Sequence, residues 1–322
     1  MSKAYFITGA KGCIGSWIVK ALIERGEEAV VFDRSQNSSR LRAIMDTDDL
    51  ARVRFINGDI TEGAAVLSAL SESKAERVIH LAGLQVPTCK ADPVTGALVN
   101  VVGTINVFEA VRTIGIKGIV YASSAAVYGM NDTDEPLDEA AQCEPTTHYG
   151  VFKRTNEGNA SVYFLDHGIY SIGLRPLTVY GVNRDTGLTS DPTKAMKSAV
   201  LGRRFHIRFS GATDFQYVAD TAATFIACAD QMPEGANIFN LHGETVTIDR
   251  ITTLINQQVA NGDLITFGGP PIPIAAAMDD SAIRKVMTAL PSTPLDVGVR
   301  ETMDRFAALR DAGKLDTSDI DT

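Results

Sequence analysis

Residues Thr8–Gly15 read TGAKGCIG and lie between a short apolar run, Ala4–Thr8, and a segment with helical spacing, Ile14–Arg25. Three glycines at this spacing allow a tight turn and a close approach of the backbone to a pyrophosphate. A helix that begins directly after the turn offers free N–H groups and the positive end of its dipole to phosphate oxygens. A glycine-rich segment of the form G-x-x-G-x-x-G could be only a turn, but its place between a strand and a helix predicts a dinucleotide-binding unit.

Short apolar runs recur through the first 180 residues and alternate with longer segments of helical spacing, such as Val99–Ile114. The runs are continuously apolar, which is typical of strands covered by helices on both faces. This order indicates parallel βαβ units with right-handed crossovers. The sequence therefore predicts an α/β protein with a Rossmann-type doubly wound parallel sheet over residues 1–180. The runs after the first are Ala29–Phe32, Val53–Ile56, Arg77–Leu81, Gly118–Ala122 and Tyr170–Leu174.

The alternation loosens after residue 180, where Arg184–Pro192 is rich in turn formers. The segment Gly268–Pro273 (GGPPIP) cannot continue a helix or a central strand. We expect residues 181–312 to form a smaller C-terminal α+β substrate-binding lobe, whose strands are free to interleave with the first sheet, and residues 313–322 to form a flexible tail. The elements expected in the lobe are helices near Pro192–Leu201, Asp220–Asp230, Asp280–Thr288 and Leu295–Arg310 and strands at Phe205–Ile207 and Ala236–Leu241.

The composition is that of a packed globular protein, with 45% hydrophobic and 21% charged residues among 322. Disorder would need fewer apolar residues and more net charge. A net charge of −9 disfavours a general binder of the nucleic-acid backbone. The four cysteines lie far apart and form no C-x-x-C pair, so the sequence predicts reduced thiols, no zinc or redox motif and no bound metal.

Targeting and membrane segments are also not expected. The chain enters a strand-like run almost at once and shows no apolar stretch followed by small residues of the signal-peptide type. The longest apolar candidate, Ile265–Met278, is broken by Gly and Pro and is shorter than the ~20 residues that a membrane helix needs. We therefore expect a soluble, cytoplasmic protein with neither a membrane nor a nucleic acid as its partner.

Further nucleotide contacts are expected where the next strands end. Asp33 ends the second strand 18 residues after Gly15, where a carboxylate can accept hydrogen bonds from a ribose diol and would repel a 2′-phosphate. This favours NAD over NADP, although Arg34 beside it weakens the inference because an arginine can bind a phosphate. Gly58–Ile60 and His80–Gly83 follow the third and fourth strands, at the edge where parallel sheets bind ligands. The alternative for these two segments is a helix cap and a simple turn.

A tyrosine and a lysine, Tyr149 and Lys153, stand four residues apart and would share one helix face. A hydride leaves a secondary alcohol only if the hydroxyl proton also leaves, and a phenolate beside the oxygen can take that proton. Tyrosine titrates near ~10, so a neighbouring ammonium group is needed to favour its phenolate. Ser124, with Ser123 as a competing choice, ends the fifth strand and can bond to the same substrate oxygen. The alternative meaning of such a tyrosine–lysine pair is an exposed helix face.

The chain at this point resembles the extended short-chain dehydrogenases/reductases, the group of NAD-dependent sugar epimerases and dehydratases, and most of all the UDP-galactose 4-epimerase type. The resemblance covers nearly the whole chain and implies that Tyr149 is the acid/base, Lys153 its partner and ribose anchor, and Ser124 the hydroxyl that orients the substrate oxygen. The features that carry it are TGAKGCIG, Asp33, Asp59, HLAG at His80–Gly83, Asn100, SSAAVYG at Ser123–Gly129, the Tyr149/Lys153 pair, Leu174–Pro176 and DFQYVAD at Asp214–Asp220.

The resemblance also implies which residues hold the NAD and how the chain associates. Members commonly form homodimers through a four-helix bundle, here from the helices near Val99–Ile114 and Tyr149–His167, and apolar residues such as Val107, Phe108 and Val111 could serve that seam or the core. The residues expected to bind NAD are Gly9, Gly12, Cys13, Ile14, Gly15, Asp33, Arg34, Asp59, Ile60, Leu81, Ala82, Gly83, Asn100, Tyr149, Lys153, Pro176 and Val179.

Two alanines argue against dehydration as the reaction. Sugar dehydratases of this group carry an Asp–Glu pair directly after the serine, where this chain has Ala125 and Ala126, so elimination of water lacks its acid and base. Two departures from the nucleotide-sugar enzymes remain. Thr178 stands where an asparagine is usual, and Thr213 stands where an arginine usually pairs with the diphosphate. Losing a charge-assisted contact with a phosphate would weaken the binding of a diphosphate considerably.

Three hypotheses therefore remain: a sugar epimerase with tightly held NAD, a net dehydrogenase or reductase of a free sugar, sugar acid or other small polyol, and a non-catalytic NAD sensor. Sensors of this kind typically lose the tyrosine or the lysine, and both are present here. Residues 184–193 could line a pocket for a small sugar-like substrate or form a plain surface loop. Four arginines, Arg184, Arg203, Arg204 and Arg208, could replace the lost arginine or be solvated surface residues. The residues expected to face the substrate are Gln85, Ser124, Ala125, Tyr149, Thr178, Arg184, Thr189 and Ser190.

Overall fold

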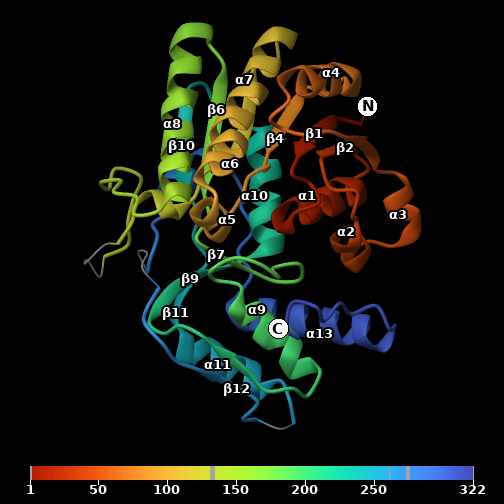
Figure 1. The fold of residues 1–322 in the computed structure, drawn as a ribbon, viewed down its shortest axis with the longest axis vertical. Helices are drawn as coiled ribbons and strands as arrows, with labels where there is room; N and C mark the ends of the chain where they lie inside the picture. Colours follow the sequence, from red (N-terminus) through yellow and green to blue (C-terminus); the bar gives the residue numbers. More distant parts are fainter. Residues whose placement is uncertain (1, 131–134, 261, 273–275, 322) are drawn as a thin grey trace.

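The computed structural model describes residues 2–130, 135–260, 262–272 and 276–321, so Met1, Pro273 and Thr322 of the segments discussed above lie outside it. The chain forms a larger body built around a sheet and a smaller body that contains the C-terminus (Figure 1). The main sheet has seven parallel strands in the order β10-β6-β5-β4-β1-β2-β3. Its strands are β1 (Ala4–Thr8), β2 (Glu28–Asp33), β3 (Arg54–Asn57), β4 (Arg77–His80), β5 (Gly118–Ala122), β6 (Tyr170–Arg175) and β10 (Ala236–Asn240).

Helices cover both faces of this sheet, which explains why its strands carry no polar alternation. On β1, Tyr5 and Ile7 belong to one apolar core and Phe6 to a second core on the opposite face. The predicted Rossmann-type α/β fold is confirmed, and each of the six predicted runs is a strand to within about one residue at either end. The covering helices are α1 (Cys13–Glu24) and α10 (Val218–Asp230), which pack together on one face, and α4 (Gly63–Ser73), α7 (Gly103–Ile114) and α8 (His148–His167) on the other.

The seventh strand, β10, comes from the C-terminal part of the chain. It pairs with β6 in parallel, with Ile238 opposite Gly173, so the expected lobe does interleave with the first sheet. The remaining C-terminal strands form two small sheets, β11-β9-β7 and β12-β8. Four of these strands were not predicted, because none of them contains a continuously apolar run of five or six residues and each pairs with a strand distant in the sequence. The small sheets contain β7 (Thr178–Tyr180), β8 (Phe205–Ile207), β9 (Ala212–Tyr217), β11 (Glu244–Thr247) and β12 (Ile265–Phe267).

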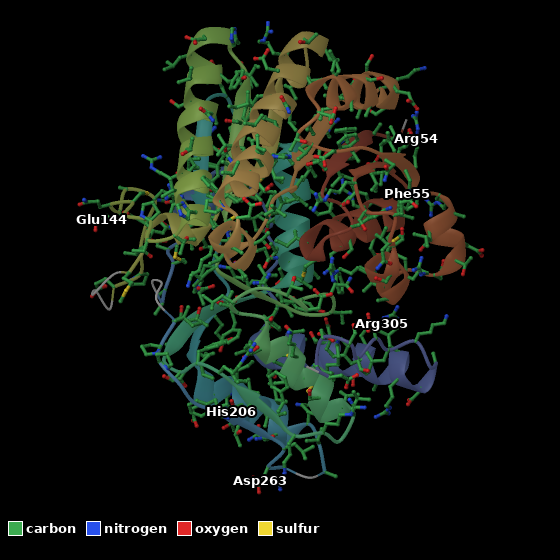
Figure 2. All side chains as sticks on the ribbon, viewed as in Figure 1. Arg54, Phe55, Glu144, His206, Asp263 and Arg305 are labelled. Atoms are coloured by element: carbon green, nitrogen blue, oxygen red, sulfur yellow. The ribbon has the colours of Figure 1, made fainter. Side chains whose placement is uncertain are left out.

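The smaller body is completed by helices that touch the larger one. Arg305 on α13 donates from Nε to the main-chain oxygen of Ala43, at 2.8 Å, and so joins this helix to the larger body (Figure 2). The helices here are α9 (Asp191–Val200), α11 (Ile248–Gln257), α12 (Ser281–Val286) and α13 (Leu295–Asp311). Short helical segments elsewhere are α2 (Ser39–Ile44), α3 (Thr47–Ala51), α5 (Val86–Ala91), α6 (Pro93–Ala97), the π-helical turn η1 (Leu98–Val102) and the 3₁₀ turn η2 (Ala125–Val127).

The last described residues lie against α9. Lys197 donates to the main-chain oxygen of Asp316 at 3.0 Å and forms an ion pair with Asp319 at 2.6 Å. Both partners of this ion pair are largely buried. The segment expected to be a flexible tail therefore has specific contacts with the smaller body.

The structure revises one expectation about apolar segments and settles one alternative. Among the described residues, Pro93–Ile114 is 22 residues long and contains an 18-residue window with a mean hydropathy of 1.5, which is long and apolar enough by composition to cross a membrane. Half of that window is buried inside the protein, as in a core helix. Val107, Phe108 and Val111 on this helix are fully buried in the core of the chain itself, so they cannot form a seam between two copies.

Candidate active site

A cavity of about 560 Å³ lies at the carboxyl edge of the main sheet, where the loops after β1, β2, β4, β5 and β6 meet. Parallel α/β sheets bind their ligands at this edge. Of the residues predicted to hold the nucleotide, all except Asn100 line this cavity. The cavity is also lined by Lys11 of the glycine-rich loop and by Asp185 and Leu188 of the 184–193 segment that was considered as a pocket lining. The sequence reasoning missed Arg40 and Asp316, because both reach the cavity only through the packing of distant segments.

The glycine-rich loop has no room for side chains at two positions. Gly9 has a φ of +66°, and a Cβ there would lie 2.6 Å from the main-chain nitrogen of Ala82. A Cβ on Gly15 would lie 2.6 Å from the main-chain oxygen of Gly9. Helix α1 follows with Gly12 as its N-cap, and no side chain caps its first N–H groups. The loop therefore fits a pyrophosphate, which would receive those N–H groups and the positive end of the helix dipole.

The carboxylate of Asp33 is held at the end of β2 by two main-chain donors. Its Oδ2 accepts from the nitrogen of Lys11 at 3.0 Å, and its Oδ1 accepts from the nitrogen of Ser35 at 2.9 Å. Asp59 also lines the cavity, and hydrogen bonds from Thr61 lower the pKa of its carboxyl group. The alternative for Asp59 was a helix cap, but the N-cap of the following helix α4 is Glu62, and Asp59 instead accepts from the nitrogen and the hydroxyl of Thr61.

Asn100 lies behind the cavity. Its Oδ1 accepts from the nitrogen of Leu84 at 3.0 Å, and its Nδ2 donates to the oxygen of the same residue at 3.1 Å. A Cβ on Gly83 would lie 2.6 Å from this Oδ1, so the amide also fixes where the loop after β4 runs. Asn100 sits in η1, and its own main-chain oxygen accepts from Asn156 at 2.8 Å. Its side chain therefore supports the loop after β4 and does not line the cavity.

Tyr149 and Lys153 both line the cavity from the first turns of α8. This helix begins at His148, and the side chain of Thr147 caps it by accepting from the nitrogen of Gly150. Lys153 is only 5% exposed, and its ammonium group donates to the main-chain oxygen of Ala122 at 2.6 Å. Its Nζ lies 5.5 Å from the centre of the Tyr149 ring. Burial lowers the pKa of Lys153 to about 8.

The pKa of the Tyr149 phenol is subject to opposing effects. Burial raises its pKa, while a hydrogen bond with Ser124 and the positive charge of Arg184 lower it. Burial dominates, so the pKa of Tyr149 lies above its ordinary value, and the cation that lowers it is Arg184 and not Lys153, which the sequence reasoning expected to favour the phenolate. Ser124 faces the cavity at the end of β5, where its Oγ accepts from the nitrogen of Ala126 at 3.2 Å. Tyr149, Ser124 and Lys153 therefore share one cavity with the glycine-rich loop.

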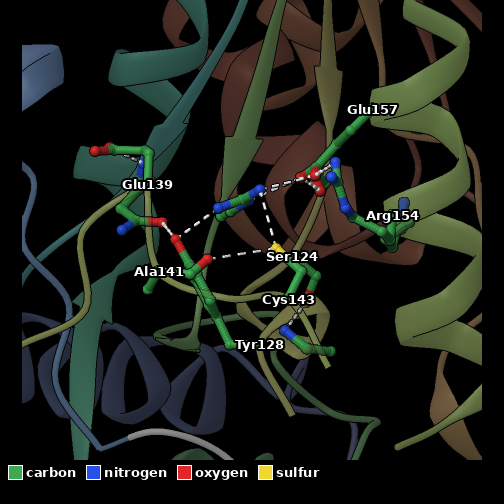
Figure 3. Close-up of polar contacts among 12 residues, drawn as sticks. Ser124, Tyr128, Glu139, Ala141, Cys143, Arg154 and Glu157 are labelled. Atoms are coloured by element: carbon green, nitrogen blue, oxygen red, sulfur yellow. Dashed lines mark hydrogen bonds and ion pairs between the residues drawn. The ribbon is translucent and has the colours of Figure 1, made fainter. Parts of the chain in front are cut away.

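The competing serine, Ser123, has a different partner. Its hydroxyl donates to Glu157 at 2.6 Å, within a buried network that also contains Arg175. Arg175 makes two bonds of 2.8 Å to the two oxygens of Glu157 and one of 2.6 Å to the hydroxyl of Tyr128. Figure 3 shows Glu157 and Tyr128 at opposite sides of this network. The paired and hydrogen-bonded charges hold the ends of β5 and β6 against α8, and so keep Ser124 and Tyr149 in place.

The substrate-facing predictions divide into two groups. Gln85, Ala125, Arg184 and Thr189 line the cavity beside Tyr149 and Ser124. Thr178 and Ser190 do not line it. The hydroxyl of Thr178 lies 2.8 Å from that of Thr213, and both residues are buried. Ser190 donates to the main-chain oxygen of Gly187 at 2.9 Å.

Other charged residues considered for the site lie elsewhere. Arg208 forms an ion pair with the buried Asp191, and Arg203 forms one with the exposed Asp321. Arg203, Arg204 and Arg208 do not line the cavity, so among the four arginines considered as replacements only Arg184 does. Burial raises the pKa of the Cys13 thiol to about 11, which makes it a packing group rather than a nucleophile.

A buried histidine, His80, connects this site to the core. Its Nδ1 lies 2.6 Å from Oγ1 of Thr8, and its Nε2 lies 2.9 Å from Oγ1 of Thr104. Because Thr104 donates its own hydroxyl hydrogen to Asn100, it accepts one from Nε2, and Nδ1 is left to accept from Thr8. The neutral imidazole is therefore fully bonded. Burial, with the charge of Lys153 as a smaller cause, lowers the pKa of His80 to about 3.

We predict that this histidine makes stability fall in mild acid. Its folded pKa of about 3 lies below the unfolded value of ~6.5, so between these values only the unfolded chain binds the proton. The contribution of His80 is complete above pH ~6.5 and is lost progressively as the pH falls toward 3. Urea midpoints at pH 7, 5.5 and 4.5 should decline less steeply in His80→Gln than in the parent, whereas the exposed control His206→Gln should follow the parent. Parallel slopes in all three proteins would contradict this assignment.

Comparisons with known proteins agree with this geometry. Residues 5–241 match the model of the NAD dependent epimerase/dehydratase family. A UDP-glucose 4-epimerase of Mycolicibacterium smegmatis is 28% identical over 308 residues, which cover 93% of this chain and 97% of that protein. A UDP-glucose 4-epimerase of Yersinia enterocolitica is 31% identical over 263 residues, 73% of this chain and 76% of that protein. The crystal structure of the Thermus thermophilus UDP-glucose 4-epimerase in complex with NAD superimposes with a TM-score of 0.80 at 25% identity and covers 94% of this chain and 98% of that one.

Proposed function

The chain belongs to the NAD-dependent epimerase/dehydratase family, and from this premise we propose that it transfers a hydride between NAD and a secondary alcohol of a sugar-like substrate, with Tyr149, Lys153 and Ser124 as its catalytic residues. It is an NAD-dependent enzyme of the sugar-epimerase type, and its relatives include UDP-glucose 4-epimerases. The observation that carries the proposal is the convergence of these three side chains with the glycine-rich loop on one cavity.

The residues present fit the cofactor. The crowded positions at Gly9 and Gly15 leave backbone rather than side chains facing a pyrophosphate, and the uncapped start of α1 supplies N–H groups. The carboxylate of Asp33, fixed by Lys11 and Ser35, would accept hydrogen bonds from the adenosine ribose. NAD, when bound, accepts the hydride of the carbinol carbon and can return it.

The protein residues handle the proton and the substrate oxygen. Tyr149, as phenolate, takes the hydroxyl proton through Oη while the C–H bond breaks, and it returns that proton when the carbonyl is reduced. Ser124 bonds to the same oxygen and keeps it in line with the phenol. The ammonium group of Lys153 donates to the oxygen of Ala122, lies 5.5 Å from the centre of the Tyr149 ring and would also bond to the nicotinamide ribose. Dehydration is not part of the proposal, because Ala125 and Ala126 carry no acid or base.

The fate of the hydride distinguishes two candidate functions, epimerase and dehydrogenase. An epimerase returns the hydride and needs only catalytic NAD, whereas a dehydrogenase releases NADH. The buried contact between Thr178 and Thr213 specifically favours the second, because these positions offer hydroxyl groups bonded to each other instead of a cation for a diphosphate. Incubation of candidate substrates with excess NAD separates them: rising absorbance at 340 nm indicates net oxidation, and isomer formation without it indicates epimerisation. If neither occurs with any sugar or polyol, the proposed function is wrong.

We further propose a soluble, cytoplasmic homodimer. Helices α7 and α8 present exposed apolar side chains, Ile114 on the first and Val162 and Leu165 on the second. Leu165 is 76% exposed, and with Val162 it gives α8 an apolar surface that a second copy would cover. Sedimentation equilibrium should give twice the monomer mass of 34.5 kDa, and a mass of one chain would contradict the dimer.

A further inference from the structure

We propose that the substrate is a monosaccharide-sized polyol that carries a carboxylate, and that the guanidinium group of Arg184 binds this carboxylate. The inference rests on the proposed function and narrows its substrate class. It depends on the segment Arg184–Ser190, which we call the partition loop. Arg184 in this loop has a side-chain donor without a partner among the described residues, and its positive charge lies beside Tyr149. The loop also separates the inner cavity from an outer groove.

One donor of the Arg184 guanidinium has no partner among the described residues. Its Nη2 donates to Oγ1 of Thr189 at 3.0 Å, and its Nε is buried and has no hydrogen-bond partner among the described residues. Asp185, the adjacent acid, makes two bonds to Arg40 instead, of 2.9 and 2.7 Å. A buried donor without a partner is costly unless a ligand satisfies it. Nε and Nη2 together form the edge that matches the two oxygens of a carboxylate.

The charge lies next to the reacting groups. Arg184 lines the same cavity as Tyr149 and Ser124, and its positive charge acts on the phenol. A substrate whose carbinol oxygen bonds to Tyr149 would therefore place a group a few atoms away within reach of this guanidinium. A carboxylate bound there also offsets a buried positive charge that no acid within the described part of the chain pairs with.

The partition loop limits the size of the substrate. Arg184 and Thr189 face the inner cavity, whereas Thr186, Gly187 and Ser190 line an outer groove of about 590 Å³. The loop packs tightly against the opposite wall, because a Cβ on Gly187 would lie 2.3 Å from Oε1 of Gln85. Two bonds from Ser190 to the main-chain oxygen of Gly187 and the ion pair of Asp185 with Arg40 hold it there.

The outer groove offers a diphosphate one lysine, Lys194, but no arginine free of an acid. Its arginine, Arg208, is engaged by both oxygens of the buried Asp191, at 2.9 and 2.7 Å. Thr178 and Thr213 bond to each other and present no charge. In the inner cavity Arg34 lies beside Asp59, at the predicted nucleotide end, and Arg184 is the arginine beside Tyr149 and Ser124. One guanidinium at that end suits one carboxylate better than a phosphate dianion, which is usually bound by several cationic or N–H donors. The observations therefore favour a small acid over both a sugar phosphate and a nucleotide sugar.

The carboxylate of the substrate is not altered by the reaction. The carbinol carbon gives its hydrogen and the electron pair of its C–H bond to NAD, the hydroxyl proton passes to Tyr149, and a carbonyl group forms. The products are the keto acid, NADH and one proton. In an epimerase the same three transfers reverse on the other face of the carbonyl.

The test compares acids with neutral molecules of the same carbon skeleton. Gluconate and galactonate are paired with sorbitol and galactitol, and glucose 6-phosphate and UDP-glucose are added, with NADH and isomer formation both measured. We expect kcat/KM to be at least about 100-fold higher for the acid of each pair. Arg184→Gln should remove about that factor for the acids, mostly through KM, and change the value for neutral polyols less than threefold. The matched control Arg203→Gln, an exposed pair partner far from the cavity lining, should change neither.

Other results would overturn the inference. If Arg184→Gln raises the Kd of NAD, measured by equilibrium dialysis, and slows acids and neutral polyols equally, the anion bound by Arg184 is the cofactor diphosphate. Preference for glucose 6-phosphate or UDP-glucose would also reject a carboxylic acid. If no compound turns over, melting of the NAD complex decides: stabilisation by gluconate or galactonate in the parent but not in Arg184→Gln supports the site, and its absence rejects it. Turnover of neutral polyols alone would leave the proposed function intact and refute only the acid.

Discussion

Tyr149→Phe is expected to lower kcat by roughly a thousandfold while the Kd of NAD changes less than threefold, because the substitution removes only the atom that accepts and returns the proton. General acid–base groups typically contribute ~10²–10⁴-fold to a rate. The ring itself, over which Lys153 lies, remains in place, so the cofactor site should keep its shape. Steady-state assays together with equilibrium dialysis of NAD separate the two quantities.

The control for this prediction is Tyr170→Phe at the start of β6, which removes a phenol outside the cavity and should leave kcat unchanged. A Tyr149→Phe enzyme with parental turnover would show that another group moves the proton. Loss of NAD binding in that variant would indicate instead that the phenol supports the cofactor site, and would leave the chemical role without support.

Gly15→Ala is expected to weaken NAD binding by at least about a hundredfold. The added Cβ would lie 2.6 Å from the main-chain oxygen of Gly9 and from Cα of Ala10, and neither backbone atom can rotate away as a side-chain tip would. The loop must therefore move, and the N–H groups that face the pyrophosphate move with it. A shift in the position of several hydrogen bonds to a diphosphate costs a few kcal/mol, and each 1.4 kcal/mol is a tenfold change in affinity.

The matched control is Gly158→Ala in the middle of α8. A Cβ at this position meets nothing within 4 Å, so the helix should gain stability by about 0.5–1 kcal/mol and NAD affinity should not change. Equilibrium dialysis gives both affinities, and urea unfolding gives both stabilities. Normal NAD affinity in Gly15→Ala would mean that the loop relaxes without cost, and the proposed contact between loop and pyrophosphate would then be incorrect.

The parts of the fold that could be predicted are those determined by residues close together in the sequence. A continuously apolar run of five or six residues between turns has few other structures available, and all six such runs became strands of the main sheet. The glycine-rich loop could be placed because close backbone approach requires glycine wherever it occurs. The same reasoning located Asp33, Tyr149 and Lys153, which follow strand ends or lie one helical turn apart.

The parts that could not be predicted depend on contacts between distant segments. Asn100 was expected to contact the nucleotide, but its amide bonds to Leu84, which lies 16 residues away. Ser123 and Ser124 are chemically identical in the sequence, and only the burial of Glu157 against β5 separates their roles. The contact of Thr178 with Thr213 likewise joins residues 35 positions apart. Patterns within a short window carry no information about such pairs.

The position of β10 has a consequence for the synthesis of the protein. Strand β6 is complete when the ribosome has passed Arg175, but its outer edge is covered only when Ala236–Asn240 has emerged and added to it. In the interval the nascent chain exposes an apolar strand edge, a structure that readily pairs with other chains. A fragment ending near residue 180 should therefore aggregate, although it contains every residue expected to bind the cofactor.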